Sequence, residues 1–458
     1  MRLFMVSPDS PLEGQRLQIN GTGWGLLEHD ISLDLNPPSD FICISYSWGT
    51  GTSASPFYAD SRVSDRTLPV LLTAVTQRPT LRKIWIDAYC VPPTSESSLR
   101  ESTLQSMGFI YSRASEVLVV LTSRAIPALQ QATGSDLWSA AHLAALEAED
   151  WVTRAWTYQE AVNARRLSFT CQDSPPSTAI DIMRFFSRLG NTLTNLPPAQ
   201  RKLYPRLCSL EELLSDCVVA EYLERSALQV MTAMDERTQT RPDDRFYAMM
   251  GAISTEPAKA VEGVGPCEAF MRLCERTGDY SFLFCKEDRE ERTGRRWRPV
   301  EGMLNPVISW HCSGPRLRGR LEGGAVTLQG VAVLELGELG EKGRTFMKDW
   351  LAGFERMGYG SWPDLEPERA VYKALRRMKF SGSADYLATE YGLVFSQSLV
   401  PQAAKVNVIV AAEIRWTFGA PSLIQFRDSA SGDGYHYEAG LFFGRVPAGD
   451  MLTDITLS

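Results

Sequence analysis

The chain has 458 residues, of which 44% are hydrophobic and 22% charged, and its net charge is −8 with a pI near 5.3. This composition is that of a globular protein with a prior of two or three domains. The acidic balance argues against a general binder of nucleic acid or of anionic membranes. The sequence contains neither a long apolar run nor a signal-peptide pattern, so we expect no membrane span and a cytoplasmic protein.

Nine cysteines and four histidines are scattered along the chain, and no CxxC pair occurs. This usage is typical of a reduced intracellular protein whose thiols, such as that of Cys90, are small buried groups. His311 and Cys312 are adjacent, but no further ligand lies at metal spacing. We therefore expect no metal site and no resident cofactor.

In chain order, residues 1–40 are polar and turn-rich and predict a short leading strand and a loop. Residues 41–49 begin as a continuous apolar run, which is typical of a buried strand in a parallel sheet. A helix is expected over 68–77, and a second buried strand over 83–90 carries Asp87 near its C-terminal end. Ligands bind at that edge of open α/β sheets.

Helices and strands continue to alternate beyond the second strand. Ser98 and Glu101 form a capping-box pattern. Further elements are expected in the order helix 104–114, strand 116–121, helix 136–149, helix 151–164 and strand 166–171. This alternation predicts a parallel sheet flanked by helices on both faces.

The helix expected over 151–164 carries a separate polar face. At about 100° per residue, Trp151 and Tyr158 fall on its apolar stripe, whereas Glu160 points almost the opposite way with Trp156 near it. A tryptophan beside a carboxylate, away from the core stripe, has no packing reason in the sequence. Glu160 is therefore the first candidate for chemistry.

The second half of the chain changes character after a break at 172–177. It is mostly helical to about residue 290, with a second capping-box pattern at Ser209 and Glu212. Strands are then expected at 307–312, 326–336, 406–416 and 435–446, with a helical insertion at 344–380. The predicted organisation is an α/β domain at 1–172, a helical segment at 173–298 and a β-rich C-terminal region at 299–458.

Four ordered motifs resemble the fungal HET (heterokaryon incompatibility) domain. The family's Ser-Tyr/His-x-Trp-Gly strand end, its Trp-Ile-Asp-Ala-x-Cys strand, its Met-Gly-x-Ile-Tyr-x-x-Ala helix and its Arg-Ala-Trp-Thr-x-Gln-Glu helix occur here as 44–49 (ISYSWG), 85–90 (WIDAYC), 107–114 (MGFIYSRA) and 154–160 (RAWTYQE). A weaker likeness covers 241–248 (RPDDRFYA), which resembles the family's downstream Pro-Arg-Asp-Lys-x-Tyr-Ala segment.

The resemblance implies a TIR-like fold, and many TIR domains cleave NAD at its nicotinamide glycosidic bond with a glutamate on a helix. It thereby implies Glu160 as a catalytic residue, and Asp87, an acid near the C-terminal end of its strand, is the second catalytic candidate. It also implies a substrate pocket with a small-molecule nucleotide as partner, lined by Tyr46, Trp48, Gly49, Arg154 and Trp156. NAD would be a substrate and not a cofactor. One departure stands out, because the family continues with Cys-Ile-Asn-Gln-x-Asp where this chain has 90–95 (CVPPTS).

Each candidate also has a plainer interpretation. Glu160 is alternatively a solvated helix residue, Trp156 a packing residue, and Asp87 a cap on the following loop. Arg154 either binds a phosphate or pairs with Glu149 or Asp150. Gly49 and Gly51 allow backbone N–H groups to approach an anion, but two glycines are a weak signal. Ser45 lacks a nearby histidine in the motifs and is not a convincing nucleophile.

Three functions remain open at this point. The first is an incompatibility or cell-death protein of the innate-immunity type that hydrolyses NAD or a related nucleotide. The second is a non-catalytic signalling module that self-assembles as a homo-oligomer, which the altered loop favours. The third is a HET-derived enzyme recruited to other small-molecule chemistry.

Overall fold

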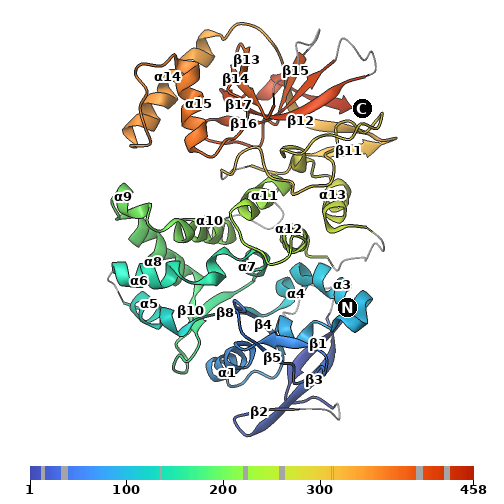
Figure 1. Cartoon of the computed structure of the whole chain (residues 1–458), viewed down its shortest axis with the longest axis vertical. Coiled ribbons are helices and arrows are strands. Elements are labelled where there is room, and N and C mark those ends of the chain that lie inside the picture. Colours follow the sequence, from blue (N-terminus) through green and yellow to red (C-terminus); the bar gives the residue numbers. More distant parts are fainter. Residues whose placement is uncertain are drawn as a thin grey trace. The chain divides into compact units, whose positions relative to one another are not determined.

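The structure is a computed structural model, and it describes residues 1–11, 16–31, 40–134, 137–219, 225–256, 264–310, 312, 314–398, 406–427 and 434–458. The chain divides into two compact units (Figure 1). Unit 1 comprises Met1–Tyr222 and Arg237–Gly263, and unit 2 comprises Leu223–Glu236 and Val264–Ser458. The segment boundaries expected near residues 172 and 298 stay predictions.

Unit 1 is built on a mixed sheet of eight strands. Four of them are parallel neighbours, and in chain order they lie as 2-1-3-4, which is a doubly wound arrangement. The three longest of these four are buried along their whole length, as expected for parallel strands with both faces covered. The sheet order is β10 (Ile180–Asp181), β9 (Leu167–Cys171), β8 (Glu116–Leu121), β4 (Ile42–Ser45), β7 (Ile84–Trp85), β1 (Arg2–Ser7), β3 (Thr22–Asp30) and β2 (Leu17–Ile19).

The short leading strand predicted at the N-terminus is β1, but the prediction missed two more strands, because residues 1–31 contribute three antiparallel strands to this sheet. β1 pairs with β3 on one side and with β7 on the other. Asn20 and Gly21 connect β2 to β3 with φ of 51° and 77°. Two consecutive positive φ angles with Asn-Gly are the signature of a tight hairpin turn. That dipeptide was the signal for the hairpin, but the polar composition of residues 1–40 obscured it.

The helices of unit 1 begin and end differently from several predictions. The expected strand 83–90 stops at Trp85, and the short helix α2 (Asp87–Cys90) follows. The helix expected over 104–114 is interrupted at Ser106, and neither Ser98 nor Ser209 caps a helix, because both lie inside one. The other elements are β5 (Thr52–Ala54), β6 (Arg62–Ser64), α1 (Thr67–Gln77), α3 (Ser97–Gln105), α4 (Met107–Arg113), α5 (Ile126–Ala132), α6 (Ala140–Glu147), α8 (Ile182–Thr194), α9 (Pro198–Arg201), α10 (Pro205–Val219) and α12 (Asp244–Ile253).

The single helix predicted over 151–164 is in fact two pieces. A 3₁₀ turn at Asp150–Thr153 precedes Arg154, which is extended with φ −71° and ψ 141°, and α7 (Ala155–Val162) begins after it. The break is held by Thr238, whose N–H donates to the carbonyl of Thr153 and whose carbonyl accepts from Ala155 N–H. A tertiary strand-like pairing thus replaces two helical hydrogen bonds.

Unit 2 carries an antiparallel sheet with a buried apolar core of aliphatic residues and Phe442. The predicted strand at 307–312 was wrong, since its described residues form bends, whereas the helical insertion is confirmed. Its elements are α11 (Ala227–Asp235), α13 (Pro266–Thr277), β11 (Gly319–Glu322), β12 (Ala325–Glu335), α14 (Glu341–Arg356), α15 (Pro367–Arg377), β13 (Tyr386–Thr389), β14 (Gly392–Ser396), β15 (Val406–Val410), β16 (Gly419–Phe426), β17 (His436–Gly444) and β18 (Leu452–Leu457).

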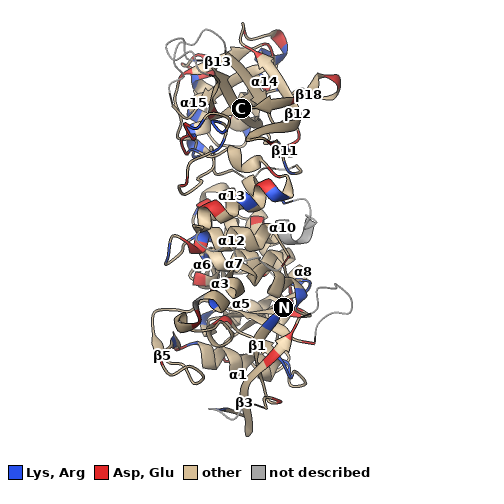
Figure 2. Ribbon diagram, turned by 90° about the vertical axis from the view of Figure 1, so that its right-hand side faces the viewer, with Lys and Arg blue, Asp and Glu red and all other residues tan. Residues whose placement is uncertain are grey.

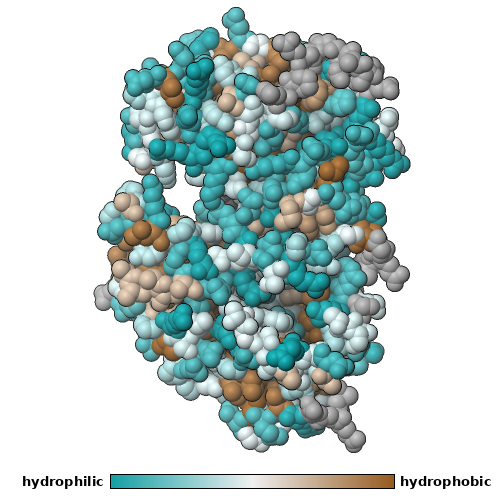
Figure 3. All heavy atoms as spheres, viewed as in Figure 1, coloured by the Kyte–Doolittle hydropathy of each residue, from teal (hydrophilic) through white to brown (hydrophobic). Residues whose placement is uncertain are grey.

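The surface carries both signs of charge. Basic and acidic residues are interspersed in both units (Figure 2), and hydrophobic side chains form small groups on the face shown in Figure 3. Among the described residues, no helix combines the length and the apolar composition needed to cross a membrane.

Candidate functional site

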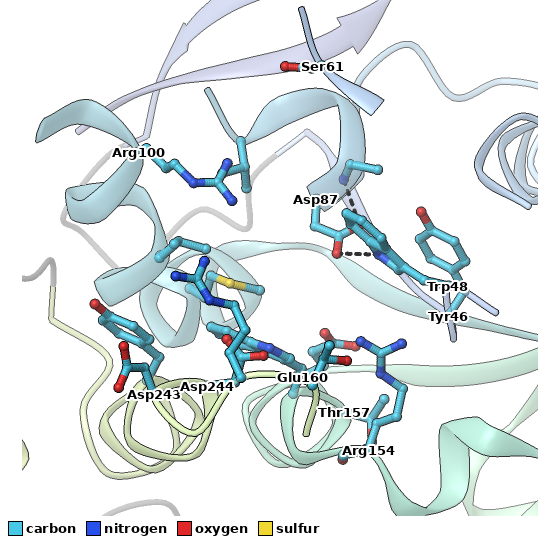
Figure 4. Close-up of a pocket in the computed structure, with 18 of the residues that line it drawn as sticks. Tyr46, Trp48, Ser61, Asp87, Arg100, Arg154, Thr157, Glu160, Asp243 and Asp244 are labelled. Atoms are coloured by element: carbon cyan, nitrogen blue, oxygen red, sulfur yellow. Dashed lines mark hydrogen bonds between the residues drawn. The ribbon is translucent and has the colours of Figure 1, made fainter. Parts of the chain in front are cut away.

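Unit 1 contains a pocket of about 440 Å³ at the edge where its parallel strands end (Figure 4). The residues that follow β4 and β7 contribute to the lining, and further side chains come from the segment around β6, from α3, α4 and α7, and from α12 with the residues before it. Six of the seven predicted site residues line this pocket, namely Tyr46, Trp48, Asp87, Arg154, Trp156 and Glu160. The seventh, Gly49, is not among the lining residues.

Glu160 lies at the inner wall of the pocket, and only 5% of its surface is exposed. The plainer interpretation of a solvated helix residue is therefore wrong. Its carboxyl group accepts a hydrogen bond from Ser45 Oγ, which in turn accepts one from Trp151 Nε1 at 2.7 Å. Because an indole N–H can only donate, the Ser45 hydroxyl proton is free to point at Glu160. The three residues form a buried chain that fixes the carboxyl group.

Burial raises the pKa of Glu160 to about 8, and the nearby Asp87 contributes to the rise. Ser45, Arg154 and Tyr111 act in the opposite direction, through hydrogen bonds from the two hydroxyls and the charge of the guanidinium. The dominant cause is the loss of water around the carboxylate. Burial therefore favours the neutral form of Glu160 over a much wider pH range than for a solvated glutamate.

Asp87 is the second carboxyl group of the pocket. Its Oδ2 accepts from Trp48 Nε1 at 3.0 Å and its Oδ1 accepts from the N–H of Ala88 at 2.7 Å (Figure 4). The bond to Ala88 is the local cap that the plainer interpretation expected, but the side chain also faces the pocket. Burial raises the pKa of Asp87 as well.

Tyr46 and Trp48 share one side of the chain after β4, as the alternation of side chains along an extended segment predicted. The hydroxyl of Tyr46 lies 2.8 Å from Thr67 Oγ1, and this bond fixes the ring at the pocket wall. Gly49 has φ +70°, so its role is to allow the turn that follows the strand. The loop that contains Gly49 is held in place by Arg66, whose guanidinium donates a hydrogen bond to the carbonyl of Ser47 at 2.6 Å.

Arg154 reaches into the pocket beside Glu160 (Figure 4). The alternative ion pairs are not formed: Glu149 accepts from the N–H and hydroxyl of Thr122, and Asp150 pairs with Arg206 at 3.7 Å. The charge of Arg154 instead opposes the rise that burial causes in the pKa values of Glu160 and Asp87. Its positive charge favours the ionised forms of both acids and so partly offsets the effect of burial.

Trp156 packs against a neighbouring helix and also lines the pocket. Its ring stacks on that of Tyr247 from α12, with centroids 6.2 Å apart and an interplanar angle of 9°. It also hydrogen-bonds the carboxyl group of Asp244, which lowers the pKa of that acid against the effect of burial. The indole remains part of the pocket lining, so packing against a neighbouring helix and exposure to a ligand coexist.

Several pocket residues escaped the sequence interpretation. They come from the loop between β5 and β6, from α3, from the segment before α12 and from α12 itself, and they are Tyr58, Arg100, Arg241, Asp243, Asp244 and Tyr247. The likeness of 241–248 to a family segment was the available signal, but nothing in the sequence placed it beside Glu160. The altered loop also reaches the pocket, since Val91 and Pro93 line it.

The described residues contain no group of three or more potential metal ligands, and their cysteines are free. Cys90 is buried, and burial raises the pKa of its thiol. A thiol in such surroundings is a packing group, as the sequence predicted.

Taken together, the doubly wound sheet and the pocket at the ends of its strands define unit 1 as an α/β domain with a candidate binding pocket. Residues 41–160 match the family model described as "Heterokaryon incompatibility protein (HET)", so the predicted HET domain is confirmed. All four sequence motifs fall inside this match. Comparison with curated proteins and with solved structures gives no match.

Proposed function

We propose that this protein cleaves NAD or a related dinucleotide at the bond between the base and its ribose. The observation that supports this most is the buried carboxyl group of Glu160, which opens onto a pocket that also holds an arginine and stacked aromatic rings. A carboxyl group sheltered from water is suited to stabilise positive charge that develops on a sugar. The doubly wound 2-1-3-4 strand order also supports a TIR-like fold.

In the proposed reaction, the bond between ribose C1′ and the nicotinamide nitrogen breaks, and its electron pair leaves with neutral nicotinamide. Water then adds to C1′ and releases a proton to solvent, which gives ADP-ribose. The carboxylate of Glu160 stabilises the positive ribosyl centre, and the cationic nicotinamide ring favours the ionised form of Glu160 in the complex. Trp156 and Trp48 offer stacking surfaces, and Asp87 adds a second carboxyl group.

The family match supports a function in heterokaryon incompatibility, and we propose that loss of NAD is the route from this domain to cell death. To test the chemistry, the full chain is incubated with NAD at high protein concentration, and nicotinamide is measured by chromatography. Glu160→Gln keeps the shape of the side chain but removes its charge. Glu116→Gln is the matched control, because Glu116 is also 5% exposed but pairs with Arg78 outside the pocket.

A second function has one observation in its favour. The loop that replaces the family's amide pair and acid lines the pocket with Val91 and Pro93, which carry no side-chain hydrogen-bonding group. A protein that lost its chemistry this way would act as a self-assembling signalling module. Such a protein would form oligomers and release no nicotinamide, whether or not it binds NAD. A co-purifying ligand of another class would instead indicate recruitment to different small-molecule chemistry.

A further inference from the structure

Arg100 enters the pocket from α3, on the side opposite Arg154 (Figure 4). Its Nη1 donates to the carbonyl of Pro92 at 2.8 Å. The loop that departs from the family pattern therefore holds this guanidinium through its backbone. No described acid forms an ion pair with Arg100, so most of its five N–H donors remain available for a ligand.

Arg241 approaches the same part of the pocket from the segment before α12. Its side chain is exposed and makes no ion pair with any residue that the structure describes. The pKa of Arg100 is lowered first by burial and then by the charge of Arg241. Two guanidinium groups that repel one another across a cavity form a natural receptor for an anion.

Three acids lie near these arginines. Asp244 is half-buried, and its carboxyl group already accepts hydrogen bonds from Trp156 and from the backbone of Arg241. Asp243 is exposed to solvent, and Asp87 is bonded to Trp48. The nearby carboxylates reduce the positive potential around Arg100 and Arg241, but none of the three forms an ion pair with either guanidinium group. An anion of higher charge density than a carboxylate would still be favoured there.

We propose that Arg100 and Arg241 form a phosphate subsite of the pocket, which binds the diphosphate group of a dinucleotide. This inference rests on the proposed function for the identity of the ligand, and it names the part of the ligand that the pocket selects. The diphosphate lies against α3 and α12, whereas the scissile ribose lies at Glu160 beside Arg154. Arg100 and Arg241 thus bind the phosphates, whereas Arg154 interacts with the carboxyl groups of Glu160 and Asp87.

The substrate class follows from this division. A planar guanidinium binds two phosphate oxygens at once, and two guanidinium groups suit a diphosphate better than a single carboxylate. The pocket should therefore discriminate against nicotinamide riboside, which carries the same scissile bond without phosphate. Loss of a charge-assisted hydrogen bond raises the dissociation constant about tenfold or more.

The test uses the full chain and inorganic pyrophosphate as the probe, with binding measured by calorimetry. Wild type should bind pyrophosphate, and Arg100→Gln and Arg241→Gln should each bind about tenfold more weakly or less. Arg124→Gln, which removes one exposed charge outside the pocket, is the matched control and should bind as wild type. Arg100→Lys keeps the charge without the planar fork and should fall between the two. Wild-type affinity in both glutamine variants, or no binding to wild type, would overturn the subsite.

Nicotinamide release separates this inference from the proposed function. If the subsite exists, both glutamine variants should raise the KM for NAD about tenfold or more, so the preference for NAD over nicotinamide riboside should fall by a similar factor. Unchanged KM values for NAD would contradict the subsite and leave the proposed chemistry standing. Arginine-dependent pyrophosphate binding without any nicotinamide release would contradict the chemistry and leave the subsite standing.

Discussion

At the scale of single residues, Glu160 combines a buried position with an ionisable group. Its pKa is raised from 4.5 to about 8, chiefly by burial. The folded protein therefore binds a proton between these pH values that the unfolded chain has released. The stability that comes from burying the neutral acid is fully present below pH 4.5 and is lost as the pH rises through 8.

We predict that Glu160→Gln removes this pH dependence, because glutamine does not titrate. The free energy of unfolding of wild type should fall relative to the variant between pH 4.5 and 9, by up to about 5 kcal/mol. Urea denaturation of both proteins at several pH values measures the difference. Parallel pH curves for the two proteins would show that the carboxyl group is not buried as a neutral acid.

Ser45 gives a prediction about the ionisation of Glu160 in the reaction. For an essential carboxylate, kcat/KM rises with pH to a plateau with an apparent pKa near 8. Ser45→Ala removes a hydrogen bond that lowers the pKa of Glu160, so the rise should move to higher pH. Ser45→Thr keeps the hydroxyl and should restore the wild-type position. A lower rate with an unmoved pH profile would mean that Ser45 is merely structural.

The identity of the pocket residues was more predictable than their contacts. The motifs pointed to Glu160, Asp87 and Trp156 because their residue types recur in a known pattern. Helical periodicity placed Glu160 away from the core stripe, but it could not show that Ser45, far away in sequence, covers it. Burial by a distant element leaves no trace in local periodicity.

At the scale of elements, the pocket depends on the close packing of α4, α7 and α12. A Cβ on Gly108 of α4 would lie 2.7 Å from Cα of Gly251 in α12 and still closer to its carbonyl oxygen. The same carbonyl accepts a hydrogen bond from Asn163 Nδ2 at 2.7 Å. Neither helix can therefore move away without losing contacts to the helix that bears Glu160.

Gly108→Ala should destabilise unit 1 by about 3 kcal/mol, because the added methyl group pushes α12 away. It should also weaken the stacking of Tyr247 on Trp156 and lower activity. Gly134→Ala is the control, since its Cβ would only reach an ordinary contact of 3.5 Å with Gln131 O, and it should change stability by less than about 0.5 kcal/mol. Thermal unfolding measures both, and equal melting temperatures would refute the close approach.

Element types were predicted well where the chain is buried on both faces and poorly where tertiary contacts decide. The strand expected at 116–121 is β8 without change. Residues 87–90 continue the apolar run 84–86 after Asp87 but form α2, and the break at Arg154 depends on its pairing with Thr238. Neither feature has a local signal, because short apolar runs fit both strands and helices.

At the scale of the whole molecule, unit 1 consists of two stretches of the chain, because the chain enters unit 2 at Leu223 and comes back to unit 1 at Arg237. Residues 237–263 supply Thr238, which holds the turn before α7, and Arg237, whose Nη1 donates to Arg154 O at 3.0 Å. They also supply Arg241, Asp244 and Tyr247 to the pocket. The matched segment 41–160 therefore contains Glu160 and Asp87 but not the pocket residues that follow Arg237.

A fragment of residues 1–222 should consequently unfold at lower temperature and with less cooperativity than a fragment of residues 1–256. The reason is that the shorter one lacks α12, which packs on α7 and α4. Circular dichroism during heating measures both transitions. Equal transitions would mean that the returning segment contributes nothing to the stability of unit 1.

The central claim is that Glu160 makes this pocket an NAD-cleaving site, and the rate of nicotinamide release tests it most directly. The full chain and its Glu160→Gln and Glu116→Gln variants are compared at pH 8, after circular dichroism has shown that all three are folded. We predict release by wild type and by Glu116→Gln, and a decrease of about 10² to 10⁴ in Glu160→Gln. Equal rates in wild type and Glu160→Gln, or no release from any of the three, would contradict the account.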